Sequence, residues 1–149
     1  MAVGGVELET IWKPIIWQQF GAAIDMLENP MRAAPDELWS DRSRRPEFWY
    51  IAYHTLFWLD YYLSDPQEGF TSPPPFTLDE FDPAGLLPER PYTKAELQTY
   101  LDHGRSKCRR TIAALTEEQA RRPWRVPWGE VSFAELLLYN MRHVQHHAA

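Results

Sequence analysis

The stretch Asn140-Met141-Arg142-His143-Val144-Gln145-His146-His147 contains three of the chain's five histidines. In an α-helix, positions i and i+4 differ by about 40° around the axis and about 6 Å along it, so His143 and His147 point the same way. His146 lies about 60° from His143 and about 100° from His147, which assigns it to the rim or to solvent. Two imidazoles one turn apart suit a first-row divalent metal. The stretch therefore predicts a helix that carries part of a metal site.

The helix that carries this pair begins at Ser132-Phe133-Ala134-Glu135, a capping box that precedes an apolar run. Val144 follows His143 at the position where the zinc-protease helix has its catalytic glutamate, and this excludes a zinc protease. A further histidine, His54, lies in an apolar stretch where a helix should face a core. Together with His143 and His147, it completes a metal-site constellation of three imidazoles, which leaves coordination positions open for catalysis.

Each part of this constellation also has a simpler interpretation. Taken alone, His54 is a core histidine that bonds to a neighbour. Taken alone, the pair His143 and His147 is a polar helix end that complements the helix dipole. A third interpretation is that the histidines bind nothing in the cell and collect metal only during nickel-affinity purification.

Two segments upstream have helical periodicity. Positions 10–27 repeat apolar residues at helical spacing, with Pro14 in the first turn and Asn29-Pro30 as the stop signal. Positions 46–63 are apolar or aromatic on two adjoining faces, with Pro46 at the first helical position, so we expect this helix to be buried on most sides. It carries His54.

A third segment, positions 93–115, begins at the capping box Thr93-Lys94-Ala95-Glu96. Thr116-Glu117-Glu118-Gln119 repeats the signature and predicts a short helix. No segment alternates over enough residues to require a sheet, and Trp124 to Gly129 is interpreted as a tight loop or a short hairpin. The fold class predicted is therefore all-α, a four-helix bundle formed by a single domain that spans residues 1–149.

The connection between the second and third helices is long and rich in proline. It runs from Ser64 to Tyr92 and includes Pro73-Pro74-Pro75, which we expect to stiffen the chain toward polyproline II. Connections of this length are uncommon unless they have a role such as covering a site. The crossover is therefore a candidate to cover a site, and an open coordination position in a deep pocket under Pro73 to Pro75 would favour an enzyme.

Composition excludes several classes of partner. The 149 residues carry a net charge of −6, so no basic field gathers phosphates and we expect no nucleic-acid partner. No segment has the length of a membrane span, so we expect no membrane association. The single cysteine, Cys108, rules out an internal disulfide framework and fits a reducing compartment, so we expect a cytoplasmic protein in which this cysteine is structural.

The chain resembles the DinB/YfiT-like family of four-helix bundle proteins from Ile11 to Ala149. The segments that carry the resemblance are Tyr53-His54-Thr55-Leu56-Phe57-Trp58-Leu59-Asp60 and the histidine stretch quoted above, with weaker likeness at Gly69 to Phe76 and Arg90 to Lys94. The resemblance implies a divalent metal, commonly nickel or zinc, held by His54, His143 and His147. It also implies relatedness to transferases or isomerases that use small thiols such as bacillithiol or mycothiol.

Five residues near these ligands are candidates for the second shell or the pocket. Asn140 and Asp60 are candidates to support the ligands, with a capping or rim role as the alternative. Tyr50, Trp58 and Tyr61 are candidates to line the pocket, although an aromatic stripe at helical spacing is typical of plain core. The sequence identifies no catalytic residue.

The leading hypothesis is a metal-dependent enzyme in which the metal activates a thiol or a water, as in a small-thiol S-transferase or a hydrolase. Its substrate would be a small-molecule thiol or electrophile. The rival hypothesis is a non-catalytic metal-binding or interaction module that dimerises through an exposed aromatic face, because seven tryptophans leave ample apolar surface. In either case we expect a homodimer.

Overall fold

The structure is a computed structural model, and it describes the backbone of residues 2–149 and the side chains of residues 10–149. It is mostly helical, in agreement with the predicted all-α class, with one small two-stranded sheet. The elements in chain order are α1 (Ala2–Ala33), α2 (Asp36–Trp39), α3 (Phe48–Tyr62), η1 (Asp79–Phe81), α4 (Lys94–Ala113), α5 (Glu117–Arg121), β1 (Pro123–Val126), β2 (Gly129–Ser132) and α6 (Phe133–Ala148). Among the described residues, no helix combines the length and the apolarity needed to cross a membrane.

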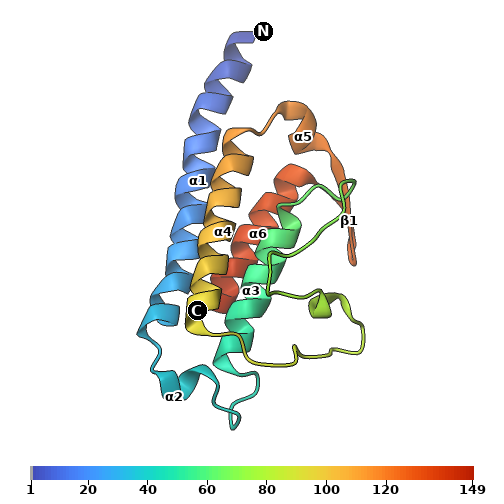
Figure 1. The fold of residues 1–149 in the computed structure, drawn as a ribbon. Helices are drawn as coiled ribbons and strands as arrows, with labels where there is room; N and C mark the ends of the chain where they lie inside the picture. The colour runs from blue at the N-terminus through green and yellow to red at the C-terminus, as the bar shows by residue number, and fades with distance from the viewer. Residues whose placement is uncertain (1) are drawn as a thin grey trace.

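Four of the helices are long and lie side by side (Figure 1). Helix α1 packs against α4 and α6, and α3 packs against the same two helices. Each contributes buried apolar side chains to a shared core, for example Phe20, Leu56, Leu101 and Leu137. Gly104 allows α4 to approach α3 closely, because a Cβ at this position would lie 2.9 Å from Leu59 Cδ2.

Helix α1 is longer than the sequence predicts at both ends. Pro14 lies inside the helix rather than in its first turn, and Asn29-Pro30 does not end it. A proline inside a helix removes one N–H bond and its ring crowds the carbonyl one turn earlier, at a cost of about 3 kcal/mol, which the packing of the long helix offsets. The last turn is stabilised because Met31 and Ala34 are buried and the Ala34 N–H donates to the Pro30 carbonyl at 2.9 Å.

The predicted caps are present at three helix starts. Both reciprocal bonds of the capping box form at Thr93 for α4 and at Thr116 for α5. Ser132 caps α6, because its hydroxyl accepts from the Glu135 N–H at 3.1 Å. At α3 the predicted start was two residues too early: Phe48 is the first helical residue, Glu47 is the N-cap residue, and Pro46 lies outside the helix.

The segment from Trp124 to Gly129 was predicted to be either a tight loop or a short hairpin, and it forms the hairpin. Strands β1 and β2 pair antiparallel, with Val126 opposite Gly129 across a two-residue turn. Trp124 and Val126 point inward and pack with Tyr62. The hairpin therefore covers the ends of α3 and α6 that meet there.

The proline-rich connection from residue 63 to residue 93 does not follow its predicted conformation. Pro74 and Pro75 lie in a turn closed by the Phe76 N–H, which donates to the Pro73 carbonyl at 3.0 Å, so the polyproline II prediction is wrong here. The turn directs Phe76 into the core, where its ring stacks on Tyr100 at 4.2 Å between centroids. Burial of the Phe76 ring favours this turn, because the ring reaches the core only if the chain turns inward.

Candidate metal centre

The three predicted ligands come together between α3 and α6. His54, His143 and His147 each offer one ring nitrogen, and these atoms lie within 4.8 Å of one another. The Nε2 atoms of His143 and His147 are 3.1 Å apart, as expected for side chains one helical turn apart. The ring of His54 lies 4.8 Å from that of His147 and 5.3 Å from that of His143, measured between centroids. Packing of α3 on α6 therefore completes the set.

The spacing and protonation of this cluster fit a divalent metal. Two imidazole nitrogens that hold one metal at tetrahedral angles are separated by about 3.4 Å. Burial, followed by repulsion from the nearby His147 and His54, lowers the pKa of His143 from its ordinary value to about 4. Burial also lowers the pKa of His147. Both rings are therefore neutral near pH 7, which is the form that binds metal.

Glu80 on η1 is a residue that the sequence analysis missed. Its Oε2 lies 2.7 Å from His54 Nδ1 and accepts from Trp58 Nε1 at 2.7 Å, and its Oε1 accepts from the Tyr50 hydroxyl. Burial raises the pKa of Glu80, but the hydrogen bonds from His54, Tyr50 and Trp58 outweigh it, and the pKa lies below its ordinary value.

The ionised Glu80 carboxylate determines which nitrogen of His54 is free. Because the carboxylate only accepts, the contact at 2.7 Å requires a proton on His54 Nδ1. In the neutral imidazole the lone pair is then on His54 Nε2, which is the nitrogen available as a ligand. A carboxylate in this position fixes the orientation of a metal-binding histidine and raises its basicity.

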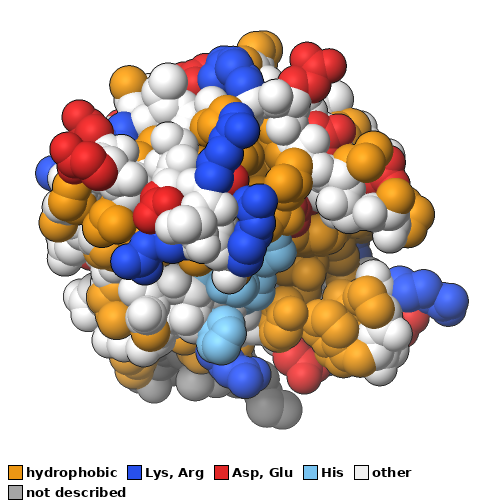
Figure 2. All heavy atoms as spheres, turned by 90° about the horizontal axis from the view of Figure 1, so that it is seen from below, with side chains coloured by type: hydrophobic (Ala, Val, Ile, Leu, Met, Phe, Trp, Pro, Cys, Tyr) orange, Lys and Arg blue, Asp and Glu red, His pale blue; other side chains and the backbone are white. Residues whose placement is uncertain are grey.

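A cleft of about 390 Å³ opens beside His54 and His143. The predicted pocket residues Tyr50 and Trp58 line it, and so do Tyr62 and Tyr139, which the sequence analysis did not select. Figure 2 shows the histidine side chains at the surface, next to hydrophobic side chains on one side and basic ones on another. The crossover residues that line the cleft include Glu80 and Leu86 but not Pro73 to Pro75.

The contacts of three other predicted residues are with side chains and backbone other than the three histidines. The Tyr61 ring contacts Phe81 and Trp124 and lines a separate hollow. Asn140 is buried and donates to the Leu59 carbonyl at 3.2 Å, which ties α6 to α3. The Asp60 carboxylate faces α4 and accepts from Tyr100 and Lys107. Helical spacing placed these residues near the histidines in sequence, but their side chains contact other parts of the core.

His146 and Cys108 lie as predicted. His146 is exposed at the rim, with its ring 5.0 Å from that of His147 between centroids. Cys108 is fully buried, and burial raises the pKa of its thiol well above the ordinary value. A buried neutral thiol is a poor nucleophile and a poor ligand, so Cys108 takes no part in the candidate site.

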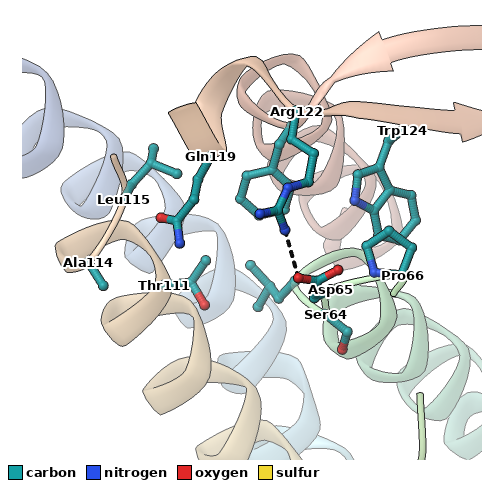
Figure 3. A pocket seen from close by; sticks show the side chains of 11 residues that line it. Ser64, Asp65, Pro66, Thr111, Ala114, Leu115, Gln119, Arg122 and Trp124 are labelled. Atoms are coloured by element: carbon teal, nitrogen blue, oxygen red, sulfur yellow. Dashed lines mark hydrogen bonds and ion pairs between the residues drawn. The ribbon is translucent and has the colours of Figure 1, made fainter. Parts of the chain in front are cut away.

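A second hollow, of about 190 Å³, lies between the end of α3 and the α4 to α5 connection (Figure 3). Its two charged side chains point toward each other, and Arg122 Nη1 lies 2.6 Å from Asp65 Oδ2. Trp124 covers one side and Leu115 another. Because Arg122 and Asp65 form an ion pair with each other, fewer unpaired polar groups are available to a ligand here than in the histidine cleft.

Comparison with known proteins places the chain in a family without naming a reaction. A sequence model described as the DinB superfamily matches residues 19–149. The matched range contains His54, His143, His147 and Glu80. Searches of curated proteins and of solved structures found no match to the chain.

Proposed function

The chain belongs to the DinB superfamily, and from this premise we propose that it is a metal-dependent enzyme that transfers a small thiol to an electrophile. The observation that carries the proposal is the cluster of His54, His143 and His147, three ring nitrogens within 4.8 Å on two packed helices. Three protein ligands leave coordination positions open, as catalytic metal sites require. The neighbouring cleft gives a substrate access to that position.

A divalent metal held by the three histidines would lower the pKa of a coordinated thiol or water and supply a nucleophile at neutral pH. Nickel and zinc are the metals we propose, since imidazole ligands suit both. In the transfer, the sulfur forms a bond to the electrophilic carbon, the leaving group departs with the bonding electron pair, and the thiol proton passes to solvent. The same site would hydrolyse a substrate if water took the place of the thiol.

The residues around the cluster have positioning roles in this proposal. Glu80 orients His54 and keeps its Nδ1 protonated. The aromatic side chains of Tyr50, Trp58 and Tyr62 line the cleft and exclude water from the reacting groups. The Tyr50 hydroxyl donates to Glu80, and burial followed by this bond raises its pKa, so it does not serve as a proton donor near pH 7.

We also propose a bundle and domain organisation for the chain. The contacts of α1 and α3 with α4 and α6 support a four-helix bundle in which residues 63–93 are the crossover and residues 1–149 form one domain. The lone buried cysteine favours a cytoplasmic location.

Metal content tests the proposal. Untagged protein purified without affinity metal is measured by elemental mass spectrometry as wild type, His54→Ala and His143→Ala. We expect about one metal per chain in the wild type and almost none in either variant. The wild type is then loaded with Co²⁺ and titrated with 2-mercaptoethanol, and a sulfur-to-cobalt absorption band reports thiol coordination. A folded wild type without metal, or one that shows no such band, would contradict the thiol transferase.

The second candidate function is a non-catalytic module that dimerises. The exposed apolar side chains Ile11, Trp12 and Ile15 on α1 favour it, because they lie one helical turn or less apart and form an exposed apolar stripe. Light scattering after size exclusion tests it, with Ile11→Glu/Ile15→Glu beside the wild type. A dimer that the double variant converts to a monomer supports an interface on α1, and a monomeric wild type excludes the homodimer.

A further inference from the structure

The charged side chains that line the histidine cleft are all acidic. They are Asp79, Glu80 and Asp82, from the connection between α3 and α4, and the described residues that line the cleft include no lysine or arginine. Glu80 is held by His54, Tyr50 and Trp58. Asp79 and Asp82 are therefore the charged side chains of the cleft that are left to meet an incoming ligand away from the histidines.

Asp79 and Asp82 are bound only by short local contacts. Asp79 Oδ2 accepts from the Thr77 hydroxyl at 2.6 Å, and Asp82 Oδ1 accepts from the Ala84 N–H at 2.8 Å. Neither carboxylate forms an ion pair with any residue that the structure describes, although both are half-buried. Other carboxylates at helix contacts do have a cationic partner: Glu28 pairs with Arg105, Asp60 with Lys107 and Asp65 with Arg122.

Aromatic rings form the other walls of the same cleft. Tyr50, Trp58, Tyr62 and Tyr139 all line it. The face of an aromatic ring attracts a cation, and the attraction grows when water is excluded. Aromatic rings together with unpaired carboxylates suit an organic ammonium group, whereas the two carboxylates would repel an anion.

We propose that the substrate in this cleft carries an organic cation, a substituted ammonium group held by Asp79, Asp82 and the aromatic walls beside the metal. This inference rests on the proposed function for the chemistry of the reacting group. Recognition of the positive charge does not depend on that function. The nearest competing feature is Arg142, which is exposed and lines a different hollow with His143 and His146. It would attract an anion instead.

The test uses three thiols that differ in one group. Thiocholine, 2-mercaptoethanol and 2-mercaptoethanesulfonate carry a trimethylammonium, a hydroxyl and a sulfonate group on the same mercaptoethyl chain, and neither charged group coordinates metal readily. Each is titrated into Co²⁺-loaded protein, and the sulfur-to-cobalt band gives its dissociation constant. The variants are Asp79→Asn/Asp82→Asn and, as a control of equal charge change outside the cleft, Glu89→Gln/Glu130→Gln.

For each thiol, the dissociation constant for the Asp79→Asn/Asp82→Asn variant is divided by that for the wild type. We expect this ratio to be about tenfold larger for thiocholine than for the sulfonate. The control variant should keep this preference. Equal ratios for the two thiols would overturn the inference, but they would not contradict coordination of the thiols by the metal. A preference for the sulfonate that disappears in Arg142→Ala would also overturn it.

A thiol-free pair separates this inference from the proposed function. Choline and its neutral isostere 3,3-dimethylbutan-1-ol are compared by isothermal titration calorimetry on the metal-loaded wild type and the same variants. Choline should bind roughly tenfold more tightly than the alcohol, and only the Asp79→Asn/Asp82→Asn variant should lose the difference. Choline binding without any thiol band would support the cation site and reject the thiol transferase. No preference for choline would reject the cation site.

Discussion

Helix α3 carries two clusters of titratable residues on different sides, and they differ in whether their polar atoms have partners. On the side that faces α4, Asp60 Oδ2 accepts from the Tyr100 hydroxyl at 3.0 Å and Lys107 bridges Asp60 and Ser64. On the side that faces α6, the Nε2 atoms of His143 and His147 face each other, and His143 Nδ1 is buried without a partner among the described residues. The first cluster is closed and the second is open.

This difference separates a structural role from a functional one. A buried carboxylate that accepts from an ammonium and a hydroxyl has its bonding capacity met, so nothing further needs to bind. Facing imidazole nitrogens within 4.8 Å have lone pairs that a cation would satisfy. The same helix therefore contributes one cluster to stability and one to a ligand site.

Breaking the closed cluster should cost the most. Asp60→Ala leaves the Lys107 ammonium and the Tyr100 hydroxyl without their buried partner, and we expect a loss of about 3–5 kcal/mol in the free energy of unfolding. Urea denaturation measures this loss. The paired replacement Asp60→Leu/Lys107→Met should recover most of it, and metal affinity should not change. A loss under about 1 kcal/mol for the single variant would show that the cluster is not structural.

Breaking the open cluster should affect metal binding and leave stability nearly unchanged. His147→Ala removes one of three ligands, and we expect the affinity for Zn²⁺ to fall more than about 100-fold. The exposed neighbour His146→Ala is the matched control, with an expected change below about twofold. Competition with a chromogenic chelator measures both. Equal losses in the two variants would exclude His147 as a ligand.

Glu80→Gln removes only the negative charge beside His54 Nδ1. The amide keeps the size of the side chain but binds the Nδ1–H less strongly and does not raise the basicity of the ring. We expect Zn²⁺ affinity to fall about 10- to 100-fold, because this is the usual effect of removing such a partner. The same competition assay reports it, with Glu89→Gln as control. An unchanged affinity would mean that Glu80 supports the loop and not the ligand.

The smallest effect concerns acid stability without metal. The pKa of His143 is about 4 in the folded chain and lies near 6.5 when unfolded, so between these values the unfolded state binds more protons. Stability should therefore fall as the pH is lowered through this window, by at most about 1.4 kcal/mol per pH unit from this residue.

His143→Asn should flatten that dependence, because the amide does not titrate. Urea midpoints in the presence of EDTA, measured from about pH 7 to about pH 4.5, compare the variant with the wild type. His146→Asn serves as control, since it should leave the slope unchanged. Parallel slopes in the wild type and His143→Asn would show that His143 titrates normally in the folded chain.

Much of the helical fold could be predicted because its signals are local. Capping boxes at Thr93 and Thr116 act over three residues, and both are present in the structure. The end of α1 could not be predicted in the same way. Pro30 is a local stop signal, but the burial of Met31 against the core outweighs it, and burial depends on residues far along the chain.

For the candidate site, His54 was selected by its apolar surroundings and by the family resemblance, whereas the pairing of His143 with His147 follows from helical geometry. The sequence by itself also determined that His146 lies at the rim. Only the tertiary structure decided that Glu80, 26 residues after His54, orients that ring, and that Asp60 turns toward α4. The physical reason is range: helix periodicity acts within a few residues, whereas Glu80 lies in a connection without periodicity, where only the path of the folded chain selects one carboxylate among several.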